Sequence, residues 1–139
     1  MQYGSMDELE KAGFEGTAWI VTVLAFNEWV DDDGIGHNEC VYWDDGEDLH
    51  PFERIFDNYD EARAYAATFD AEMAMWAHAH GVGTEYEHIS VDVVQFEFDG
   101  EMADGDARCM FEWFGGRDLE VVEFDENWHQ ILPVFEEAM

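Results

Sequence analysis

The residues best suited to specialised chemistry in this chain are its histidines and cysteines. His37 and Cys40 are separated by two residues and His78 and His80 by one, and both spacings occur among metal ligands. A structural zinc site needs three or four ligands in closed tetrahedral geometry, and no second pair repeats either spacing. We therefore predict no metal site, and we expect Cys40 and Cys109 to pack within strands. The remaining candidate ligands are His50, His88 and His129.

Two acidic segments suggest calcium chemistry without fulfilling its requirements. Residues 31–34, Asp-Asp-Asp-Gly, lack the ligand alternation and the terminal glutamate of an EF-hand loop. The acids of residues 99–106 are spaced just as imperfectly. We expect weak divalent-cation binding from such a surface, but no dedicated metal site and no cofactor.

Carboxylate pairs can perform general acid–base catalysis. About a quarter of this chain is acidic, so such pairs arise throughout it by chance. The sequence has no glycine-rich phosphate loop, no Gly-x-Ser-x-Gly elbow and no kinase motif set. A strongly negative field also disfavours phosphate substrates. The sequence therefore predicts a protein that is not an enzyme.

The net charge is the dominant feature of the composition. The 139 residues include 35 Asp and Glu against 5 Lys and Arg, which gives a formal net charge of −30 and a pI near 4.1. Most carboxylates must therefore face water or a binding partner. Direct nucleic-acid binding needs a basic patch, which five cations cannot supply. An anionic membrane surface is disfavoured for the same reason, and no apolar run is long enough to predict a membrane span.

This charge exceeds what solubility requires, since a net charge of about 2–8 suffices for a small domain. A compact chain of this length has a radius of gyration of about 14 Å and is roughly 37 Å across. Duplex DNA of that length carries roughly 22 phosphate charges. The protein and the duplex thus have comparable charge at comparable size.

The clearest predicted element is a helix over residues 59–80. Asn58 is a suitable N-cap, Glu61 completes a capping-box pattern, and Gly81 is a natural C-terminal stop. Helical spacing places one apolar stripe on this segment. Its members are Tyr59, Ala62, Ala66, Phe69, Met73, Trp76 and His80.

The other elements are predicted to be mainly strands. Residues 17–26 form an apolar run typical of a central strand, and 39–43 and 86–98 predict two more. Gly115-Gly116 predicts a hairpin between 109–114 and 118–124. An amphipathic segment at 126–138 predicts a C-terminal helix, kinked or interrupted at Pro133.

Together these elements predict one α+β domain over residues 1–139. We expect a largely antiparallel sheet of four to five strands, with the long helix and the C-terminal helix packed on it. A short helical turn is expected over residues 7–13. Met6 offers an alternative natural start, with residues 1–5 as an added expression tag.

Acidic residues recur in several loops and along strands, where a rigid sheet would hold them in a fixed array. Trp29 and Trp43 adjoin two of these acidic loops and could supply apolar anchors. The predicted partner-binding residues are Asp31, Asp32, Asp33, Asp44, Asp45, Glu47, Asp48, Asp99, Glu101, Asp104, Asp106, Asp118, Glu120, Glu123, Glu126, Trp29 and Trp43.

In size, acidity, scarcity of lysine and aromatic content, the chain resembles DNA-mimic inhibitor proteins. That group includes anti-CRISPR proteins, anti-restriction proteins and uracil-DNA glycosylase inhibitors. The resemblance is one of composition, with no shared motif. It implies a phage or mobile-element inhibitor that occupies the DNA- or RNA-binding surface of a host defence nuclease. A CRISPR complex is favoured because it has a long basic channel.

Other functions remain open from the sequence. An immunity protein that neutralises a nuclease toxin would need a similar acidic surface, and a halophilic protein would be acidic for an unrelated reason. Two cysteines and no apolar leader indicate a reducing cytoplasm, that of the host cell if the protein is phage-encoded. A homodimer is also compatible with the sequence.

Overall fold

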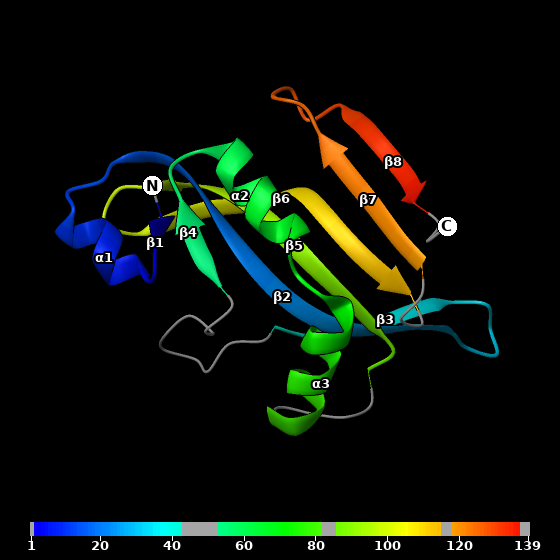
Figure 1. Cartoon of the computed structure of the whole chain (residues 1–139). Helices are drawn as coiled ribbons and strands as arrows, with labels where there is room; N and C mark the ends of the chain where they lie inside the picture. Colours follow the sequence, from blue (N-terminus) through cyan, green and yellow to red (C-terminus); the bar gives the residue numbers. More distant parts are fainter. Residues whose placement is uncertain (1, 43–52, 82–85, 115–117, 137–139) are drawn as a thin grey trace.

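The molecule is built around one large antiparallel sheet, seen in a computed structural model that describes residues 2–42, 53–81, 86–114 and 118–136 (Figure 1). Eight strands form the sheet in the order β1-β4-β2-β5-β6-β7-β8, with β3 also paired to β2. The strands are β1 (Gln2–Tyr3), β2 (Gly16–Val30), β3 (Gly36–Tyr42), β4 (Arg54–Phe56), β5 (His88–Phe98), β6 (Met102–Phe114), β7 (Asp118–Phe124) and β8 (Gln130–Glu136). The described helices are α1 (Met6–Lys11), α2 (Tyr59–Ala67) and α3 (Ala71–Gly81). The prediction of four to five strands with one long helix is therefore wrong.

The predicted helix over 59–80 is divided into two because polar side chains compete for its backbone. The Thr68 hydroxyl donates to the carbonyl of Tyr65 at 2.7 Å, where α2 ends. The Asp70 carboxylate then accepts from the backbone amide of Glu72 at 2.8 Å and caps α3 as a new helix. The predicted cap at the other end is confirmed, since Asn58 Oδ1 accepts from the amide of Glu61 at 3.0 Å.

The predicted C-terminal helix is also wrong, because residues 130–136 form strand β8. This strand pairs antiparallel with β7, and Pro133 lies opposite Val122. Proline is tolerated here because β8 is the last strand of the sheet, where a missing backbone N–H disrupts fewer ladder bonds. A short apolar run does not by itself separate a strand from a buried helix.

Strand β2 is the central strand that its apolar run predicts. Its first half lies beside β4, its second half lies beside β3, and β5 pairs with it along the other edge. Successive side chains point to opposite faces of a strand. Val21 and Val23 therefore belong to one core, whereas Ala18 and Ile20 belong to another on the opposite face.

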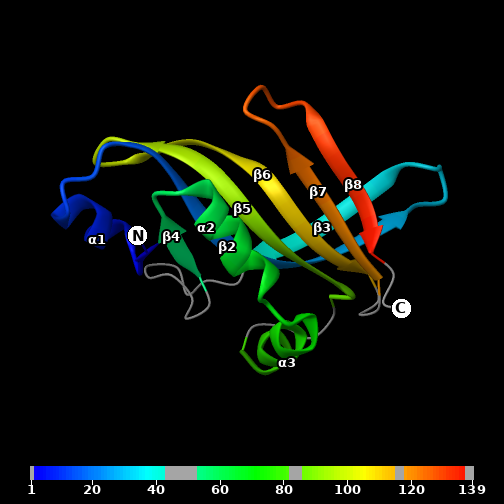
Figure 2. The same cartoon turned by 45° about the horizontal axis from the view of Figure 1, so that its top comes forward.

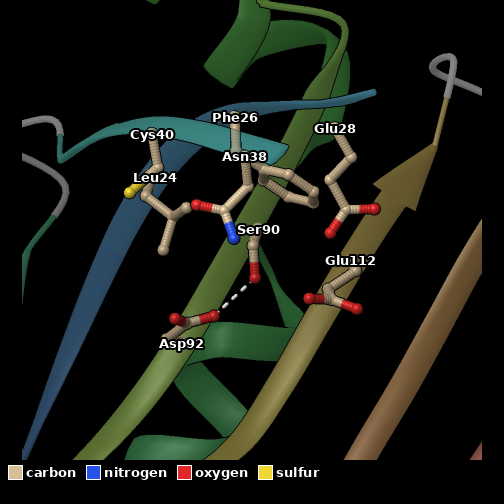
Figure 3. Close-up of a pocket in the computed structure, with 8 residues that line it drawn as sticks. All are labelled: Leu24, Phe26, Glu28, Asn38, Cys40, Ser90, Asp92 and Glu112. Atoms are coloured by element: carbon tan, nitrogen blue, oxygen red, sulfur yellow. Dashed lines mark hydrogen bonds between the residues drawn. The ribbon is translucent and has the colours of Figure 1, made fainter. Parts of the chain in front are cut away.

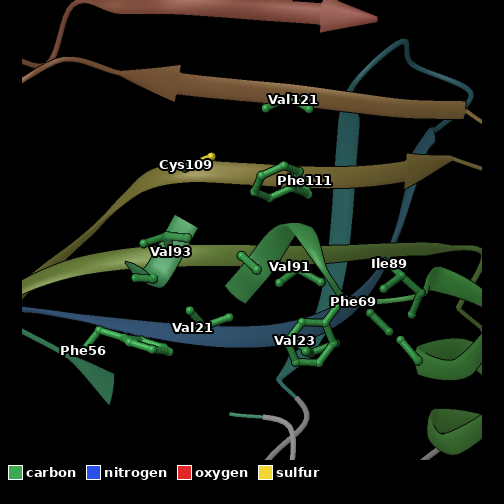
Figure 4. Packing of buried hydrophobic residues seen from close by; sticks show 14 residues of the cluster. Val21, Val23, Phe56, Phe69, Ile89, Val91, Val93, Cys109, Phe111 and Val121 are labelled. Carbon is green, nitrogen blue, oxygen red and sulfur yellow. The ribbon is translucent and has the colours of Figure 1, made fainter. Parts of the chain in front are cut away.

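The helices cover the two faces of the sheet unequally. Helices α2 and α3 pack over Val21, Val23 and Val91 in the larger core (Figure 4). Helix α1 packs through Leu9 against Phe96 and other residues at one end of the opposite face. Beyond α1, no helix among the described residues covers this second face (Figures 1 and 2). We call that uncovered part the open face.

Helix α2 is anchored to the sheet by a buried carboxylate. Glu123 of β7 is 8% exposed and accepts hydrogen bonds from Tyr59 and Arg63 of α2. The distance from Arg63 Nε to Glu123 Oε2 is 2.7 Å, and the guanidinium also lies over the ring of Phe111. Burial and the bond to Glu123 raise the pKa of Tyr59 above its usual range, so Tyr59 remains a donor.

A β-bulge extends this network across the sheet. Val93 pairs with Cys109 and Val94 pairs with Ala107, so Arg108 is the extra residue. Its guanidinium donates to the carbonyl of Phe124 at 2.8 Å and to Gln95 at 2.7 Å, and it lies 4.6 Å from the centre of the Tyr59 ring. Two of the chain's few cations are thus used inside the fold.

Residues 2–5, for which the sequence offers an added tag as an alternative, take part in the fold. Strand β1 pairs with β4, Tyr3 is buried, and Ser5 caps α1 by accepting from the amide of Glu8. Helix α1 fulfils the expectation of a helical turn near 7–13. None of the helices in the described ranges is long and apolar enough to cross a membrane.

Removing the buried anchor should destabilise the protein strongly. We expect Glu123→Ala to lower the free energy of unfolding by about 3 kcal/mol, because Arg63 and Tyr59 lose their shared acceptor. Urea titration followed by circular dichroism measures this change. Glu126→Ala, which removes an exposed acid from the next turn, is the control and should change stability by less than about 0.5 kcal/mol. Equal effects of the two substitutions would contradict the anchoring role of Glu123.

Candidate functional site

The first predicted acidic group lies at the tip of the hairpin between β2 and β3. Asp32 and Asp33 are exposed there, but Asp31 is turned toward the backbone. Its Oδ1 accepts from the amides of Asp33 and Ile35 at 2.9 and 3.0 Å, and its Oδ2 lies 2.7 Å from Nε2 of His37. These hydrogen bonds hold the pKa of Asp31 below its usual value, with the contribution of His37 the largest. Asp31 therefore organises the turn, while its two neighbours face solvent.

Trp29 lies on the same hairpin and is well placed as an anchor. It is 46% exposed and stacks on the ring of His37, with ring centroids 5.5 Å apart. Because His37 is itself held by Asp31, the indole has a supported orientation. Val30 and Ile35 are also exposed on this hairpin, which projects from the body of the sheet with no helix over it (Figure 2).

The second predicted group lies at the opposite end of the long strands. Asp99 and Glu101 are exposed at the turn between β5 and β6, and Asp106 is exposed within β6. The pairing of Gly16 with Phe98 sets this turn at the start of β2, whereas Asp31 follows its end. At about 3.3 Å per residue, the two groups are roughly 45 Å apart when measured along β2.

The remaining predicted residues have varied positions. Glu126 is exposed in the turn between β7 and β8, Glu120 is half-buried on the open face, and Glu123 is buried in the anchor of α2. Asp104 and Asp118 lie on β6 and β7, and their side chains are not described. The following predicted residues lie outside the described ranges: Trp43, Asp44, Asp45, Glu47 and Asp48.

The open face gathers carboxylates that the sequence did not single out. Residues directly opposite each other on paired strands share a face. Glu112 lies opposite Glu120 on one side and Ser90 on the other, and Asp92 lies one pair further along β5. Glu28 of β2 completes the group, opposite Asn38 of β3. We call Glu28, Asp92, Glu112 and Glu120 the open-face carboxylates.

A pocket of about 180 Å³ opens among three of these acids (Figure 3). Leu24 and Phe26 form its apolar part, and the carboxylates of Glu28 and Glu112 point into the same space. Asp92 is 6% exposed and accepts a hydrogen bond from the hydroxyl of Ser90. The full lining is Leu24, Phe26, Glu28, Asn38, Cys40, Ser90, Asp92 and Glu112.

Burial makes Asp92 and Glu112 hard to ionise, and repulsion from neighbouring acids adds to the effect at Glu112. Burial raises the pKa of Asp92 to about 6, although the bond from Ser90 opposes the shift. Burial also raises the pKa of Glu112 to about 7, and the charges of Asp92, Glu120 and Glu28 add to this effect. Like charges directly opposite each other across strands are destabilising. An incoming positive group would relieve this repulsion.

Chemically, the arrangement suits the binding of an organic cation better than a metal site or thiol chemistry. Within the described ranges, no three His, Cys, Asp or Glu side chains converge closely enough to hold a metal ion. The buried Cys109 has its pKa raised to about 12, by burial first and then by Glu123, which leaves its thiol unreactive. Perturbed carboxylates in a pocket are typical of functional sites, and here they lack a positively charged partner on their own face among the described residues.

The sequence did contain a local signal for one open-face carboxylate, Asp92. In β5, Ser90 and Asp92 interrupt the apolar series Ile89, Val91 and Val93 with polar residues at alternate positions. Such a pattern predicts a polar set on one face of a strand. In a chain with acids at so many positions, this local alternation was not distinguished from solvent-facing charge.

The chain matches no family model, no curated protein and no solved structure. Its function must therefore be argued from its own residues.

The pH dependence of stability tests the burial of Asp92. A folded-state pKa of about 6 against 3.8 in the unfolded chain means that the folded protein binds the proton more tightly. Stability should therefore fall as the pH rises from about 4 to 6. Asp92→Asn removes this ionisable group. The free energy of unfolding of the variant should therefore exceed that of the wild type by near zero at pH 4 and by on the order of 3 kcal/mol at pH 7.

Urea titrations of both proteins at pH 4–8 measure this gain. Asp106→Asn removes one exposed charge from β6 and serves as the control, with a much smaller change across the same range. A gain from Asp92→Asn that does not vary with pH would contradict an ionisable, buried Asp92.

The role of Asp31 can be separated from that of its acidic neighbours. We expect Asp31→Ala to speed hydrogen exchange at the amide of Ile35 about fivefold, because a hydrogen bond worth about 1 kcal/mol is lost. Asp33→Ala removes an equal charge and should leave that exchange rate within twofold of the wild type. Equal acceleration in both variants would show that net charge, rather than the Asp31 bond, holds the turn.

Proposed function

We propose that this protein is an inhibitor that binds the nucleic-acid-binding surface of a basic protein in place of DNA or RNA. The observation that carries the proposal is the distribution of charge. Arg63 and Arg108 are committed to contacts inside the fold, so little positive charge offsets the acids outside. A chain with a formal net charge of −30 favours basic partners and speeds association with them.

The geometry supports a binding role because the acids are held on a rigid scaffold. Strands β2, β5 and β6 pair over most of their length, and exposed acids lie at both ends of this pairing. Pre-ordered charges lose little conformational freedom when they bind, which favours affinity. A partner with a long basic channel could contact several acidic groups at once.

Among basic partners, a CRISPR nuclease complex of a host cell is the target we favour. The RNA–DNA heteroduplex of such a complex lies in a long, positively charged channel. The protein recognises the heteroduplex through its backbone rather than its base sequence. An acidic scaffold of this kind could therefore act as an anti-CRISPR protein by mimicking the phosphate backbone, without groups that resemble nucleobases. An immunity protein would instead bind one nuclease toxin through a smaller surface.

A competition experiment with purified nucleases tests the proposal. Labelled target DNA is titrated onto guide-loaded CRISPR effectors, a restriction enzyme, a uracil-DNA glycosylase and a toxin nuclease. Each titration is repeated at increasing concentrations of the acidic protein as competitor. We expect the apparent Kd for DNA of one CRISPR effector to rise in proportion to the protein concentration. Inhibition should weaken as salt rises, because the contact is electrostatic. Folded protein that displaces DNA from none of these nucleases would contradict the proposal, and displacement from the toxin alone would favour the immunity role.

Charge-reversal variants test whether the effect belongs to the surface as a whole. Asp32→Lys with Asp33→Lys should weaken inhibition by no more than about tenfold, because exposed charges contribute modestly and share one field. Wild-type levels of inhibition after neutralisation of Asp32, Asp33, Asp99, Glu101 and Asp106 together would contradict charge mimicry.

Salt adaptation makes a different prediction about stability. A mimic should be folded at 0.1 M KCl, with further salt adding modest stability by screening repulsion. Thermal unfolding at 0.1 and 2 M KCl measures this. A chain that folds only in molar salt would assign its acidity to the environment rather than to a partner.

A further inference from the structure

The pocket on the open face combines features that an exposed acidic patch does not have. Its walls include Leu24 and Phe26, both less than a tenth exposed, and its floor includes the nearly buried Ser90 and Asp92. Glu28 and Glu112 stand at its sides (Figure 3). Ligand pockets are typically apolar with a few convergent polar groups.

Asp92 presents an acceptor that the described residues do not use. Its Oδ1 accepts the hydroxyl of Ser90, and no described residue donates to its Oδ2. The adjacent Thr22, which lies opposite Asp92 on β2, has a buried Oγ1 without a hydrogen-bond partner in the described ranges. Buried polar groups are normally satisfied. The remaining acceptor of Asp92 lines the cavity, and the unpartnered hydroxyl of Thr22 lies opposite Asp92, so this part of the sheet has hydrogen-bonding capacity for a donor-rich ligand.

We propose that this pocket receives the guanidinium group of an arginine side chain from the partner protein. The inference rests on the proposed function and adds the chemistry by which the partner is held. The guanidinium would donate to Asp92 Oδ2 at the floor and to Glu112 and Glu28 at the sides. The aliphatic part of the arginine would pack along Leu24 and Phe26.

Arginine fits this site better than the other available cations. The acids do not converge as metal ligands do within the described ranges. A guanidinium has five N–H donors in a planar fork and is more weakly hydrated than an ammonium, so it suits several separate acceptors in a partly apolar pocket. The ring of Phe26 also offers a surface on which a guanidinium can stack. A lysine would present one compact charge to acceptors that lie on different strands.

Binding of a cation here should be coupled to proton release. The groups that face the pocket are Glu28 from β2, Asp92 from β5 and Glu112 from β6, with Cys40 and Asn38 from β3. Glu120 of β7 lies beside Glu112, and His88 lies one pair along β5. Because the pKa of Glu112 is about 7 without a ligand, its ionised fraction grows through the neutral range. The bound cation favours the ionised form, so affinity should rise with pH.

Nuclear magnetic resonance titration of the isolated protein tests the proposal. The probe is arginine capped as its N-acetyl amide, compared with capped lysine and with capped citrulline, the neutral isostere. We expect saturable shifts centred on the amides of residues 24, 90, 92 and 112 with capped arginine at pH 7.5. Capped lysine should bind at least threefold more weakly, and capped citrulline should give no saturable shift.

Two variants separate the pocket from the general acidic surface. Asp92→Asn should fold and weaken capped arginine at least tenfold, whereas Asp33→Asn, with the same loss of charge at the hairpin tip, should leave its affinity within twofold. The wild-type affinity should be several-fold higher at pH 8 than at pH 5.5. Shifts spread over all acidic segments, equal affinities for arginine and lysine, or no effect of Asp92→Asn would each overturn the proposal.

The outcome is independent of the nuclease competition, because the titration contains no nuclease. Displacement of DNA by the protein without an arginine site would uphold the inhibitor function and reject the pocket. A specific arginine site without displacement from any nuclease would uphold the pocket and reject the inhibitor function.

Discussion

The buried carboxylate of Glu123 is the contact on which the arrangement of the other elements depends. It joins β7 to α2 through Tyr59 and Arg63, and the bulge at Arg108 adds β5 and β6 to the same network. In a chain with so few cations, placing two of them here fixes the helix against the sheet. Both cations lie on the α2 side of the sheet, against Phe111 and Tyr59, so neither offsets the acids of the open face.

On the open face, this uneven distribution of cations lowers the stability of the fold. Glu112 and Glu120 lie directly opposite each other, and Asp92 is nearly buried on the strand beside Glu112. Burial raises the pKa of both Asp92 and Glu112, and repulsion raises that of Glu112 further, so the folded state holds protons that the unfolded chain would release. Such a face is under-stabilised in isolation and gains most when a positive group arrives. Acids at the hairpin tips differ in kind, because Asp31 and Asp125 are already used as acceptors for their own turns. Formal charge therefore overstates the number of carboxylates available to a partner.

The sequence predicted those elements whose signals are local. The cap at Asn58 and the apolar strand β2 follow directly from residue type and spacing. The division of the long helix depended on Thr68 and Asp70, whose side chains could equally have faced solvent. Strand β8 was predicted to be a helix because its short apolar run fits both the helical and the strand periodicity. Only its pairing with β7 decides between the two. Glu112 was missed because its raised pKa arises from burial within the sheet and from the charges of Asp92, Glu120 and Glu28 on three other strands, and no local pattern reveals either.

Pro133 has a consequence for self-association. A sheet that ends in a regular strand offers a template on which another copy can add and propagate toward fibrils. Strand β8 has one position that cannot donate a backbone hydrogen bond, so it is a poorer template than its length suggests. Mutual repulsion between copies gives a second protection, but dissolved salt weakens it, since the Debye length falls to about 3 Å at 1 M. The effect of an edge proline does not depend on ionic strength, so it would still oppose strand addition where charge is screened.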